Sequence, residues 1–433
     1  MLRMLAGEAA RRHGRREAFV GGGRRVTFAD LDRLSDAVAA GLAHRGVLPG
    51  DVVAIALPPI PEYAVCSLAV AKLAAIAAGY DPRLPPESLA RLHEVVQPCL
   101  TIAAPDLWLS GELVTVEPAG RAGGQRTDRT DGPGAEATQA LGRLARAEPP
   151  PPPLPPDPYR PVMITTAGPV DDPRGAIFGG RQLEAIRQAE AGTRWGGGEP
   201  QLLGEGSAEF LNRLPSVLQS GTTVYASPAP AAGPESGQED HAAAVAGGLR
   251  ATAELGLPAL TGSPERLAVV LERPLPPELD FSALREVVLV GPAPDPAFVR
   301  ALRERFGVPV RTEYRPVEAG LGVATGRDGP PEDAEATVGR PAPGVTVAIR
   351  DATGRAVHTG GTGDVLLRSG AVMSGYWNDP AATARTITKD GFVRTGDLGW
   401  VDEEGRLHLA GPAERTSEPR AAPAGGRRRP ARS

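Results

Sequence analysis

Residues 391–411 read GFVRTGDLGWVDEEGRLHLAG, and the carboxylate of Asp397 stands there between Gly396 and Leu398. The apolar residues on both sides alternate, which predicts a β-hairpin, and the glycines predict a turn around the acid. Such a carboxylate is either part of an ordinary surface turn or the acceptor for hydroxyl groups of a ligand. From these residues alone, the surface turn is the preferred interpretation.

Thiols, histidines and lysines offer little further chemistry. Cys66 and Cys99 are the only cysteines, too few for a disulfide framework, and no His or Cys residues have the spacing of metal ligands. Lys72 and Lys389 are the only lysines, since every other basic residue is an arginine. A mechanism that requires a lysine therefore has only these two candidates.

Length and composition predict a globular protein of more than one unit. A chain of 433 residues is too long to fold around one simple core, so we expect roughly two or three subdomains. No stretch approaches about 18 uninterrupted apolar residues, and no long apolar segment follows the N-terminal arginines. We therefore expect no membrane span, no secretory signal and a cytoplasmic location. The net charge of −5 argues against a nucleic-acid partner.

The N-terminal part of the chain alternates between helical and strand patterns. The expected elements are a helix opened by the capping box of Thr27 and Asp30, a turn and apolar strand over 49–58, helices over 61–79 and 85–97, and a strand over 99–104. This alternation predicts a parallel α/β sheet with right-handed crossovers.

Composition divides the rest of the chain. Residues 119–159 have few large apolar side chains and end in a polyproline run, which predicts a flexible insertion, and residues 227–240 predict a surface loop. Residues 285–314 indicate a strand, a loop, a helix and a strand. The expected division is a first α/β segment (1–118), the insertion (119–159), a second α/β segment (160–343), a small antiparallel β subdomain (344–411) and a disordered Arg/Pro-rich tail (412–433).

Four motifs in order give the chain a family resemblance: RERFGVPVRTEYRPVEAG, VGRPAPGVTV, SGYWNDPAATARTI and RTGDLGWVDEEGRLHLAG. Together they resemble the adenylate-forming, or AMP-binding, enzymes, and the likeness runs from about Thr27 to Gly411. The motif GYWNDPAAT is more similar to the corresponding motif of acid–CoA ligases than to that of peptide-synthetase adenylation domains. The resemblance implies two doubly wound α/β subdomains followed by the small antiparallel β subdomain.

The resemblance also implies site residues. Asp397 matches the acid that accepts hydrogen bonds from the ribose hydroxyls of ATP or AMP, which reverses the preference for a plain surface turn. Glu318 matches the acid that holds Mg²⁺ against the phosphates, and Tyr314 matches the aromatic residue beside adenine. Gly291 matches the first glycine of a loop next to the nucleotide. Arg315 replaces a glycine, so a long cation stands where relatives have no side chain.

The loop TAGPVDDPRG, residues 166–175, matches the phosphate loop of the family. The loop begins at Thr166, a candidate binding residue, and retains Gly168, Pro173 and Gly175 of the family pattern. Arg174 stands where lysine is usual, and guanidinium also binds phosphate. The positions that usually carry hydroxyl groups have lost them, and Asp171 replaces a glycine beside the β- and γ-phosphates. Because like charges repel, we expect this loop to bind a triphosphate poorly.

Relatives continue after the equivalent of residue 411 with a domain of roughly a hundred residues, which carries the catalytic lysine. Here the sequence becomes Pro- and Arg-rich, so we expect that domain to be absent, and neither Lys72 nor Lys389 matches the lysine by alignment. No catalytic residue is therefore named.

The implied function is ATP-dependent activation of a fatty or aromatic carboxylic acid as acyl-adenylate, with transfer to coenzyme A and with impaired catalysis. A non-catalytic protein that binds AMP or acyl-adenylate is the first alternative, and an amino-acid adenylation domain is the second.

Overall fold

The computed structural model describes residues 1–116, 141–203, 207–226, 238–292 and 295–412, apart from residues 22, 59, 105, 106, 108, 156 and 194. The helices are α1 (Leu2–His13), α2 (Phe28–His44), α3 (Pro61–Lys72), α4 (Pro86–Val96), α6 (Gly180–Glu190), α7 (Ser207–Ser220), α8 (Gln238–Glu254), α9 (Pro264–Glu272), α10 (Pro296–Phe306), α11 (Pro331–Ala336) and α12 (Pro380–Thr386), with a 3₁₀ turn η1 (Val317–Ala319).

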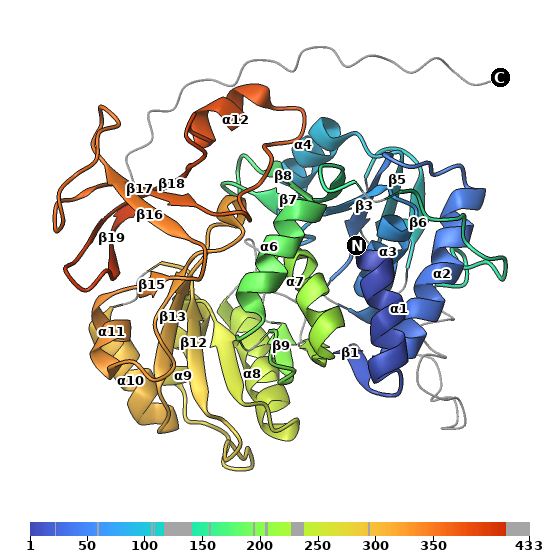
Figure 1. Ribbon diagram of the computed structural model, residues 1–433. Helices are drawn as coiled ribbons and strands as arrows, with labels where there is room; N and C mark the ends of the chain where they lie inside the picture. The colour runs from blue at the N-terminus through green and yellow to red at the C-terminus, as the bar shows by residue number, and fades with distance from the viewer. Residues whose placement is uncertain are drawn as a thin grey trace.

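The strands fall into four sheets. They are β1 (Glu17–Gly21), β2 (Arg24–Thr27), β3 (Val52–Ala56), β4 (Ile76–Gly79), β5 (Leu100–Ala103), β6 (Leu113–Thr115), β7 (Pro161–Ala167), β8 (Arg174–Gly179), β9 (Gln201–Leu203), β10 (Val224–Ala226), β11 (Ala259–Gly262), β12 (Glu286–Val290), β13 (Val310–Tyr314), β14 (Val323–Ala324), β15 (Arg340–Pro341), β16 (Thr346–Arg350), β17 (Gly363–Arg368), β18 (Val393–Val401) and β19 (Leu407–Pro412). Figure 1 shows the antiparallel sheet β16–β19 above the sheet that contains β12 and β13, and the N-terminal elements beside both.

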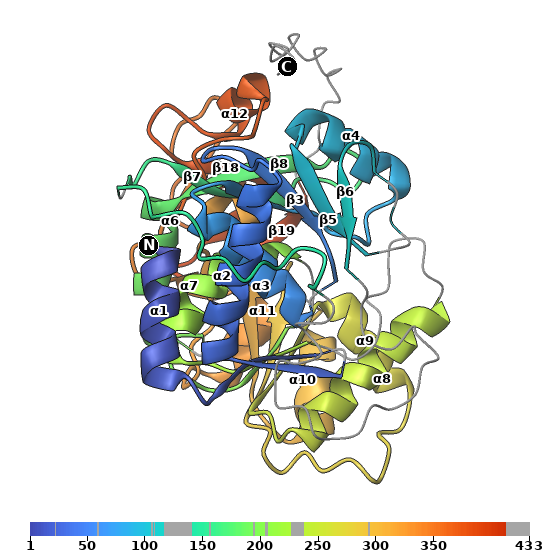
Figure 2. The same cartoon turned by 90° about the vertical axis from the view of Figure 1, so that its right-hand side faces the viewer.

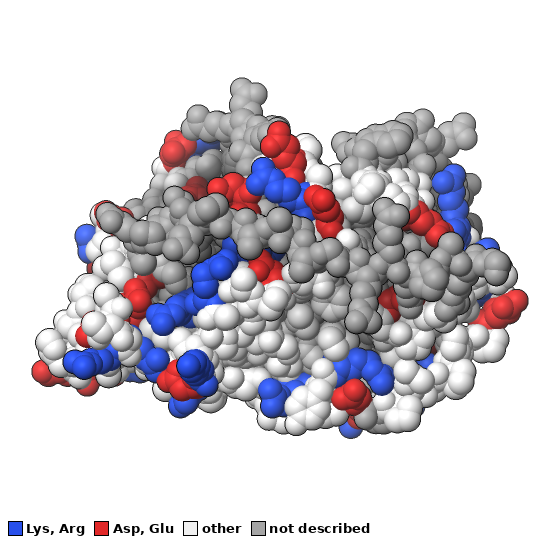
Figure 3. Space-filling model, turned by 90° about the horizontal axis from the view of Figure 1, so that it is seen from above, with Lys and Arg blue, Asp and Glu red and all other residues white. Residues whose placement is uncertain are grey.

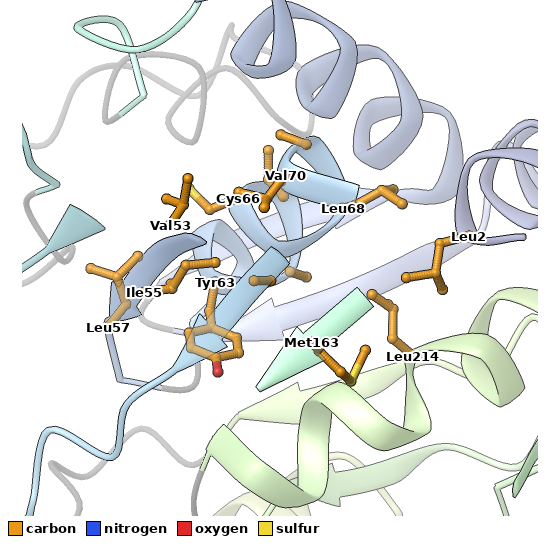
Figure 4. Close-up of a cluster of buried hydrophobic side chains, with 14 of the residues drawn as sticks. Leu2, Val53, Ile55, Leu57, Tyr63, Cys66, Leu68, Val70, Met163 and Leu214 are labelled. Atoms are coloured by element: carbon orange, nitrogen blue, oxygen red, sulfur yellow. The ribbon is translucent and has the colours of Figure 1, made fainter. Parts of the chain in front are cut away.

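The first sheet has the order β6-β5-β3-β4-β7-β8 and is parallel except for the pair β7–β8. Helices α2 and α3 pack together beside it, as the turned view in Figure 2 shows. Every residue of β3 is buried, as its apolar sequence predicts for a strand covered on both faces. In the core of Figure 4, Val53 and Ile55 of β3 lie among Tyr63, Leu68 and Met163.

The predicted capping box is confirmed, because the Thr27 side chain accepts from the Asp30 N–H and the Asp30 side chain accepts from the Thr27 N–H. The predicted helix over 61–79 is wrong in its second half. Helix α3 ends at Lys72, and Ile76–Gly79 forms strand β4 between β3 and β7. A short apolar run fits a buried strand as well as a buried helix, so the strand pairing decided the outcome.

The sheet β11-β12-β13-β14-β15 begins with three parallel strands and ends with antiparallel pairs. Its strand–helix–strand unit β12, α10 and β13 confirms the pattern predicted for residues 285–314. A further sheet has the order β2-β1-β10-β9.

The sheet β16-β17-β18-β19 is wholly antiparallel, as predicted for the region after residue 344. The turn of its last hairpin, however, is not at Asp397. Strand β18 runs through Asp397, and the turn follows at residues 402–405. Gly396 has φ +84°, and the pairing of β18 with β17 shifts between Asp364 and Leu366, so the acid lies on a bulge inside a strand.

Parts of the predicted insertion and loops lie outside the described residues. These are residues 119–140 of the insertion, 227–237 of the surface loop and 413–433 of the tail. Leu141 and Leu144, at the end of the predicted insertion, are buried in the hydrophobic core that contains Val53 and Ile55 of β3. Gln238, in the predicted surface loop, is the first residue of α8.

Lys72, the last residue of α3, is buried, and its ammonium group lies 2.7 Å from a carboxylate oxygen of Asp32 and 2.7 Å from one of Asp36. Within the described ranges, no helix is both long enough and apolar enough to cross a bilayer. On the face seen in Figure 3, basic and acidic side chains are interspersed.

Candidate active site

The first pair of site residues is Tyr314 with Asp397. Tyr314 is the last residue of β13, and Asp397 lies on the β18 bulge, so the two come from different sheets. The Tyr314 hydroxyl donates a hydrogen bond to Oδ2 of Asp397. Burial raises the pKa of the Tyr314 phenol, and the hydrogen bond to Asp397 and the charges of Asp397 and Glu318 raise it further. The phenol is therefore a protonated donor at neutral pH.

The second pair is Tyr376 with Glu318. Glu318 lies in the turn η1, four residues after Tyr314, and the Tyr376 hydroxyl donates to its Oε1 at 2.7 Å. The main-chain N–H of Met373 donates to the Glu318 carbonyl at 2.9 Å. Both the backbone and the side chain of Glu318 are thus held by residues that precede α12.

The predicted phosphate loop joins β7 to β8. Arg174, at the start of β8, is ion-paired with Asp172, and its Nε lies 3.6 Å from Oδ2 of Asp379. Its guanidinium carbon lies 5.5 Å from the centroid of the Tyr376 ring. Asp171 is exposed. The one cation of this loop is therefore already partnered by two carboxylates.

The neighbouring loop residues have backbone roles. The Thr166 hydroxyl donates to the carbonyl of Gly79 at 2.9 Å, so it is engaged with β4. Gly168 has φ +79°, which favours glycine, and a Cβ on Gly175 would lie 2.5 Å from the Ile164 side chain. Two of the three retained residues are thus required by the local packing and turn.

Gly291 follows β12, and its N–H donates to the carbonyl of Glu313 at 2.9 Å. It has φ +127°, and no atom of the described residues lies within 4 Å of the position of a Cβ. The glycine therefore lies beside the end of β13, next to Tyr314.

Arg315 does not project as an unpaired cation. Its guanidinium lies 3.1 Å from Oε1 of Glu190 and 3.5 Å from Oε2 of Glu313. Glu190 is buried on α6 and also pairs with Arg213, whose guanidinium stacks on Trp195 at 4.7 Å. The cation that replaces the family's glycine thus belongs to a charge cluster beneath the candidate site.

Asp397 contacts Tyr314 directly, and Glu318 and Arg174 both contact Tyr376. The two groups are neighbours, because β18 packs on the turn η1 and the charge of Glu318 acts on the Tyr314 phenol. Sequence reasoning missed Tyr376 and Asp379 as site residues. Both lie in the motif GYWNDPAAT, and this position was the available signal. A separate groove of about 970 Å³ between α1 and α6 contains none of these residues.

Glu318 fits the role of a magnesium ligand. Within the described ranges, no group of three or more His, Cys, Asp or Glu side chains could hold a metal by itself. Mg²⁺, however, is usually held by one or two carboxylates together with substrate phosphates and waters. Glu318 supplies one such carboxylate. Its Oε1 accepts from the Tyr376 hydroxyl, and the Tyr376 ring lies against Arg174 of the predicted phosphate loop.

Comparison with known proteins gives a consistent picture. The profile of the family described as "AMP-binding enzyme" matches residues 7–377. A 3-[(3aS,4S,7aS)-7a-methyl-1,5-dioxo-octahydro-1H-inden-4-yl]propanoyl:CoA ligase of Rhodococcus jostii is 32% identical over 151 residues, which are 35% of this chain and 27% of that protein. The indoleacetate–CoA ligase of Aromatoleum aromaticum is 33% identical over 148 residues, which are 34% of this chain and 29% of that protein. The matched stretch is thus less than a third of either relative's length.

Solved structures extend the likeness to nearly the whole chain. The amide bond synthetase McbA from Marinactinospora thermotolerans has a TM-score of 0.73 and 27% identity, covering 94% of this chain and 79% of that one. The o-succinylbenzoate CoA synthetase of Bacillus subtilis, in complex with its acyl-adenylate intermediate, has a TM-score of 0.74 and 18% identity, covering 94% and 98%. At 18% identity the second likeness supports the fold alone.

Proposed function

Because the chain belongs to the AMP-binding enzyme family, we propose that it activates a carboxylic acid as acyl-adenylate and transfers the acyl group to coenzyme A. The observation that carries this proposal is the proximity of Asp397 on β18, Tyr314 on β13 and Glu318 in the turn η1. Asp397 offers a carboxylate for ribose hydroxyls, and Glu318 offers one for Mg²⁺. A single nucleotide bound with its metal ion would use both carboxylates.

The chemistry gives each residue a task. A carboxylate oxygen of the acid attacks the α-phosphorus of ATP, the bond to pyrophosphate breaks, and the acyl-adenylate forms. AMP is then displaced by the thiol of coenzyme A. Asp397 and Tyr314 would hold the nucleoside, Glu318 would hold Mg²⁺, and Arg174 would bind the phosphates. When bound, Mg²⁺ neutralises phosphate charge and orients the triphosphate.

The residues of the phosphate loop are expected to slow the first step, the formation of acyl-adenylate from ATP. Arg174 is partnered by Asp172 and Asp379, so it must exchange these contacts before it can bind phosphate. Asp171 adds a negative charge that repels the β- and γ-phosphates. AMP lacks those two phosphates and escapes the repulsion.

These same observations favour a second candidate, a non-catalytic protein that binds AMP or acyl-adenylate. It needs the Asp397–Tyr314 pair but not a competent phosphate loop. Two relatives are ligases of indoleacetate and of a fused-ring propanoic acid, which supports an aromatic or fatty acid as the substrate or ligand class.

ATP–pyrophosphate exchange separates the two candidates. We expect slow exchange, stimulated by aromatic or fatty acids, together with AMP binding measured by calorimetry. AMP binding without exchange on any acid of a wide panel selects the non-catalytic candidate. Absence of binding to AMP, ATP and acyl-adenylate analogues contradicts both.

A further inference from the structure

We propose that Tyr376 is a positioning residue, which orients Glu318 for Mg²⁺ and keeps this carboxylate apart from Arg174. The inference rests on the function proposed above, because it concerns how that site binds a nucleotide with its metal ion.

Tyr376 contacts a carboxylate and a cation through different parts of one side chain. Its hydroxyl donates to Oε1 of Glu318 at 2.7 Å, whereas the guanidinium carbon of Arg174 lies 5.5 Å from the ring centroid. The side chain is 6% exposed, so these contacts are fixed by packing. The phenol thus lies between two groups of opposite charge.

The backbone around Tyr376 is tied to both groups. We call residues 373–377 the strap. Its Ser374 and Trp377 N–H groups donate to the Ile177 and Gly175 carbonyls at 2.9 and 2.8 Å, which joins the strap to β8, where Arg174 begins. Its Met373 N–H donates to the Glu318 carbonyl. The strap therefore links the phosphate loop to the turn that carries Glu318.

A second anchor fixes the tyrosine itself. The Tyr376 N–H donates to Oγ1 of Thr383 at 2.8 Å, and this hydroxyl in turn donates to the Asp379 carbonyl at 2.9 Å. Asp379 also caps α12, where its Oδ1 accepts from the Ala382 N–H. The ring orientation is thus set by the start of a helix as well as by β8.

The separation of Glu318 from Arg174 has a chemical consequence. Opposite charges in contact near a protein surface attract strongly, so a direct pair would engage the carboxylate that Mg²⁺ needs and the cation that phosphate needs. Arg174 instead pairs with Asp172 and Asp379. A neutral phenol satisfies one oxygen of Glu318 and leaves its charge intact for the metal. Burial raises the pKa of the Tyr376 phenol, so it remains a donor at neutral pH.

Replacing Tyr376 by Phe isolates the hydroxyl, because the ring over Arg174 is kept. Removing a hydrogen-bond partner of a metal ligand commonly costs roughly tenfold to a hundredfold in metal affinity. In Tyr376→Phe, more Mg²⁺ should be needed for ATP binding. We expect the half-saturating Mg²⁺ concentration, measured by calorimetry, to rise roughly tenfold to a hundredfold. AMP affinity without Mg²⁺ should stay within about twofold of wild type.

Two further variants calibrate the measurement. Glu318→Gln removes the metal ligand itself, so ATP binding should no longer depend on Mg²⁺. Tyr159→Phe makes the same chemical change at an exposed tyrosine, whose ring lies against Arg181, and should leave every value unchanged. Should Tyr376→Phe fail to fold, Thr383→Val removes the anchor of the strap and is expected to shift the Mg²⁺ requirement in the same direction.

The outcomes distinguish this inference from the proposed function. Wild-type protein that binds neither ATP nor AMP contradicts the function and the inference together. Wild-type protein with Mg²⁺-dependent ATP binding, matched by Tyr376→Phe, overturns only the inference. Equal loss of AMP binding and Mg²⁺-dependent ATP binding in Tyr376→Phe also overturns it, since that result indicates general disruption of the site.

Discussion

Two tyrosine–carboxylate pairs form the centre of the candidate site. Tyr314 donates to Asp397, and Tyr376 donates to Glu318. A buried hydroxyl costs free energy unless it is hydrogen-bonded, and a carboxylate is the strongest acceptor available, so each pair stabilises its own geometry. A ligand that uses Asp397 must share this acid with the phenol or displace it.

Asp397→Asn tests the ribose assignment at the residue scale. The change keeps the size of the side chain but removes the charge that strengthens its hydrogen bonds. Since a hydrogen bond to a charged group is worth about 1.5–3 kcal/mol, we expect AMP affinity to fall roughly tenfold to a hundredfold. Calorimetric titration with AMP measures this. Asp364→Asn, on the neighbouring strand β17, is the matched control, and equal affinities for both variants would reject the role of Asp397.

Asp171→Asn tests the repulsion argument. Asp171 is exposed, and its carbonyl, which accepts from Arg91, is kept in the variant. Removing one like charge about 4 Å from phosphate should raise ATP affinity by at least roughly tenfold near a protein surface. AMP affinity should stay constant, because AMP lacks the β- and γ-phosphates. The exposed Asp328 provides a control for loss of an acid elsewhere, and unchanged ATP affinity in Asp171→Asn refutes the argument.

At the scale of elements, a bulge and a turn position the two carboxylates. Strand β18 accommodates extra residues opposite β17, and the positive φ of Gly396 turns the chain just before Asp397. The turn η1 is followed by Gly320, where a Cβ would lie 2.5 Å from the Ala371 carbonyl oxygen. The turn that carries Glu318 therefore packs closely against Ala371, just before the strap.

Gly41 offers a test of element packing far from the site. It lies in α2, where a Cβ would lie 1.5 Å from the Leu144 carbonyl oxygen. Such overpacking commonly costs about 1–3 kcal/mol, so Gly41→Ala should lower the free energy of unfolding by that amount in urea titrations. Gly248→Ala in α8 is the control, since among the described residues its Cβ would meet only Leu202, at 3.9 Å. Helix propensity predicts that this control is neutral or stabilising by up to about 1 kcal/mol. A Gly41 variant as stable as the control shows that Leu144 does not pack on α2.

At the scale of the whole molecule, buried tyrosines control stability at alkaline pH. Burial raises the pKa values of Tyr80, Tyr314 and Tyr376 above the ordinary value of about 10. The unfolded chain releases these protons first as pH rises, so it becomes favoured, and their contribution to stability, complete below pH 10, is lost above it.

Urea unfolding between pH 8 and pH 11 measures this effect. Each such tyrosine should lower the free energy of unfolding by up to about 1.4 kcal/mol per pH unit above pH 10. Tyr80→Phe should flatten the slope without loss of stability at pH 8, because the Tyr80 hydroxyl has no hydrogen-bond partner in the part of the chain that the structure describes. An unchanged slope in this variant contradicts the assignment.

Several elements and candidate site residues could be predicted from the sequence alone, because the patterns that indicate them are local. The capping box of Thr27, the apolar strand β3 and the strand–helix–strand unit after residue 285 follow from short-range patterns. The candidate site residues Asp397, Glu318 and Tyr314 were predicted from motifs whose order could be read along the chain.

Tertiary structure decided what depends on contacts between distant segments. Residues 76–79 became a strand because β3 and β7 offered pairing on both sides, which no local pattern of short apolar residues reveals. Asp397 lies within a strand rather than in a turn because β17 and β19 pair with β18 on both sides of it. The partners of Arg174 and Glu318, namely Asp379 and Tyr376, were set by the crossing of the strap with β8. Hydrogen bonds and ion pairs depend on distances in space, and the fold alone fixes these.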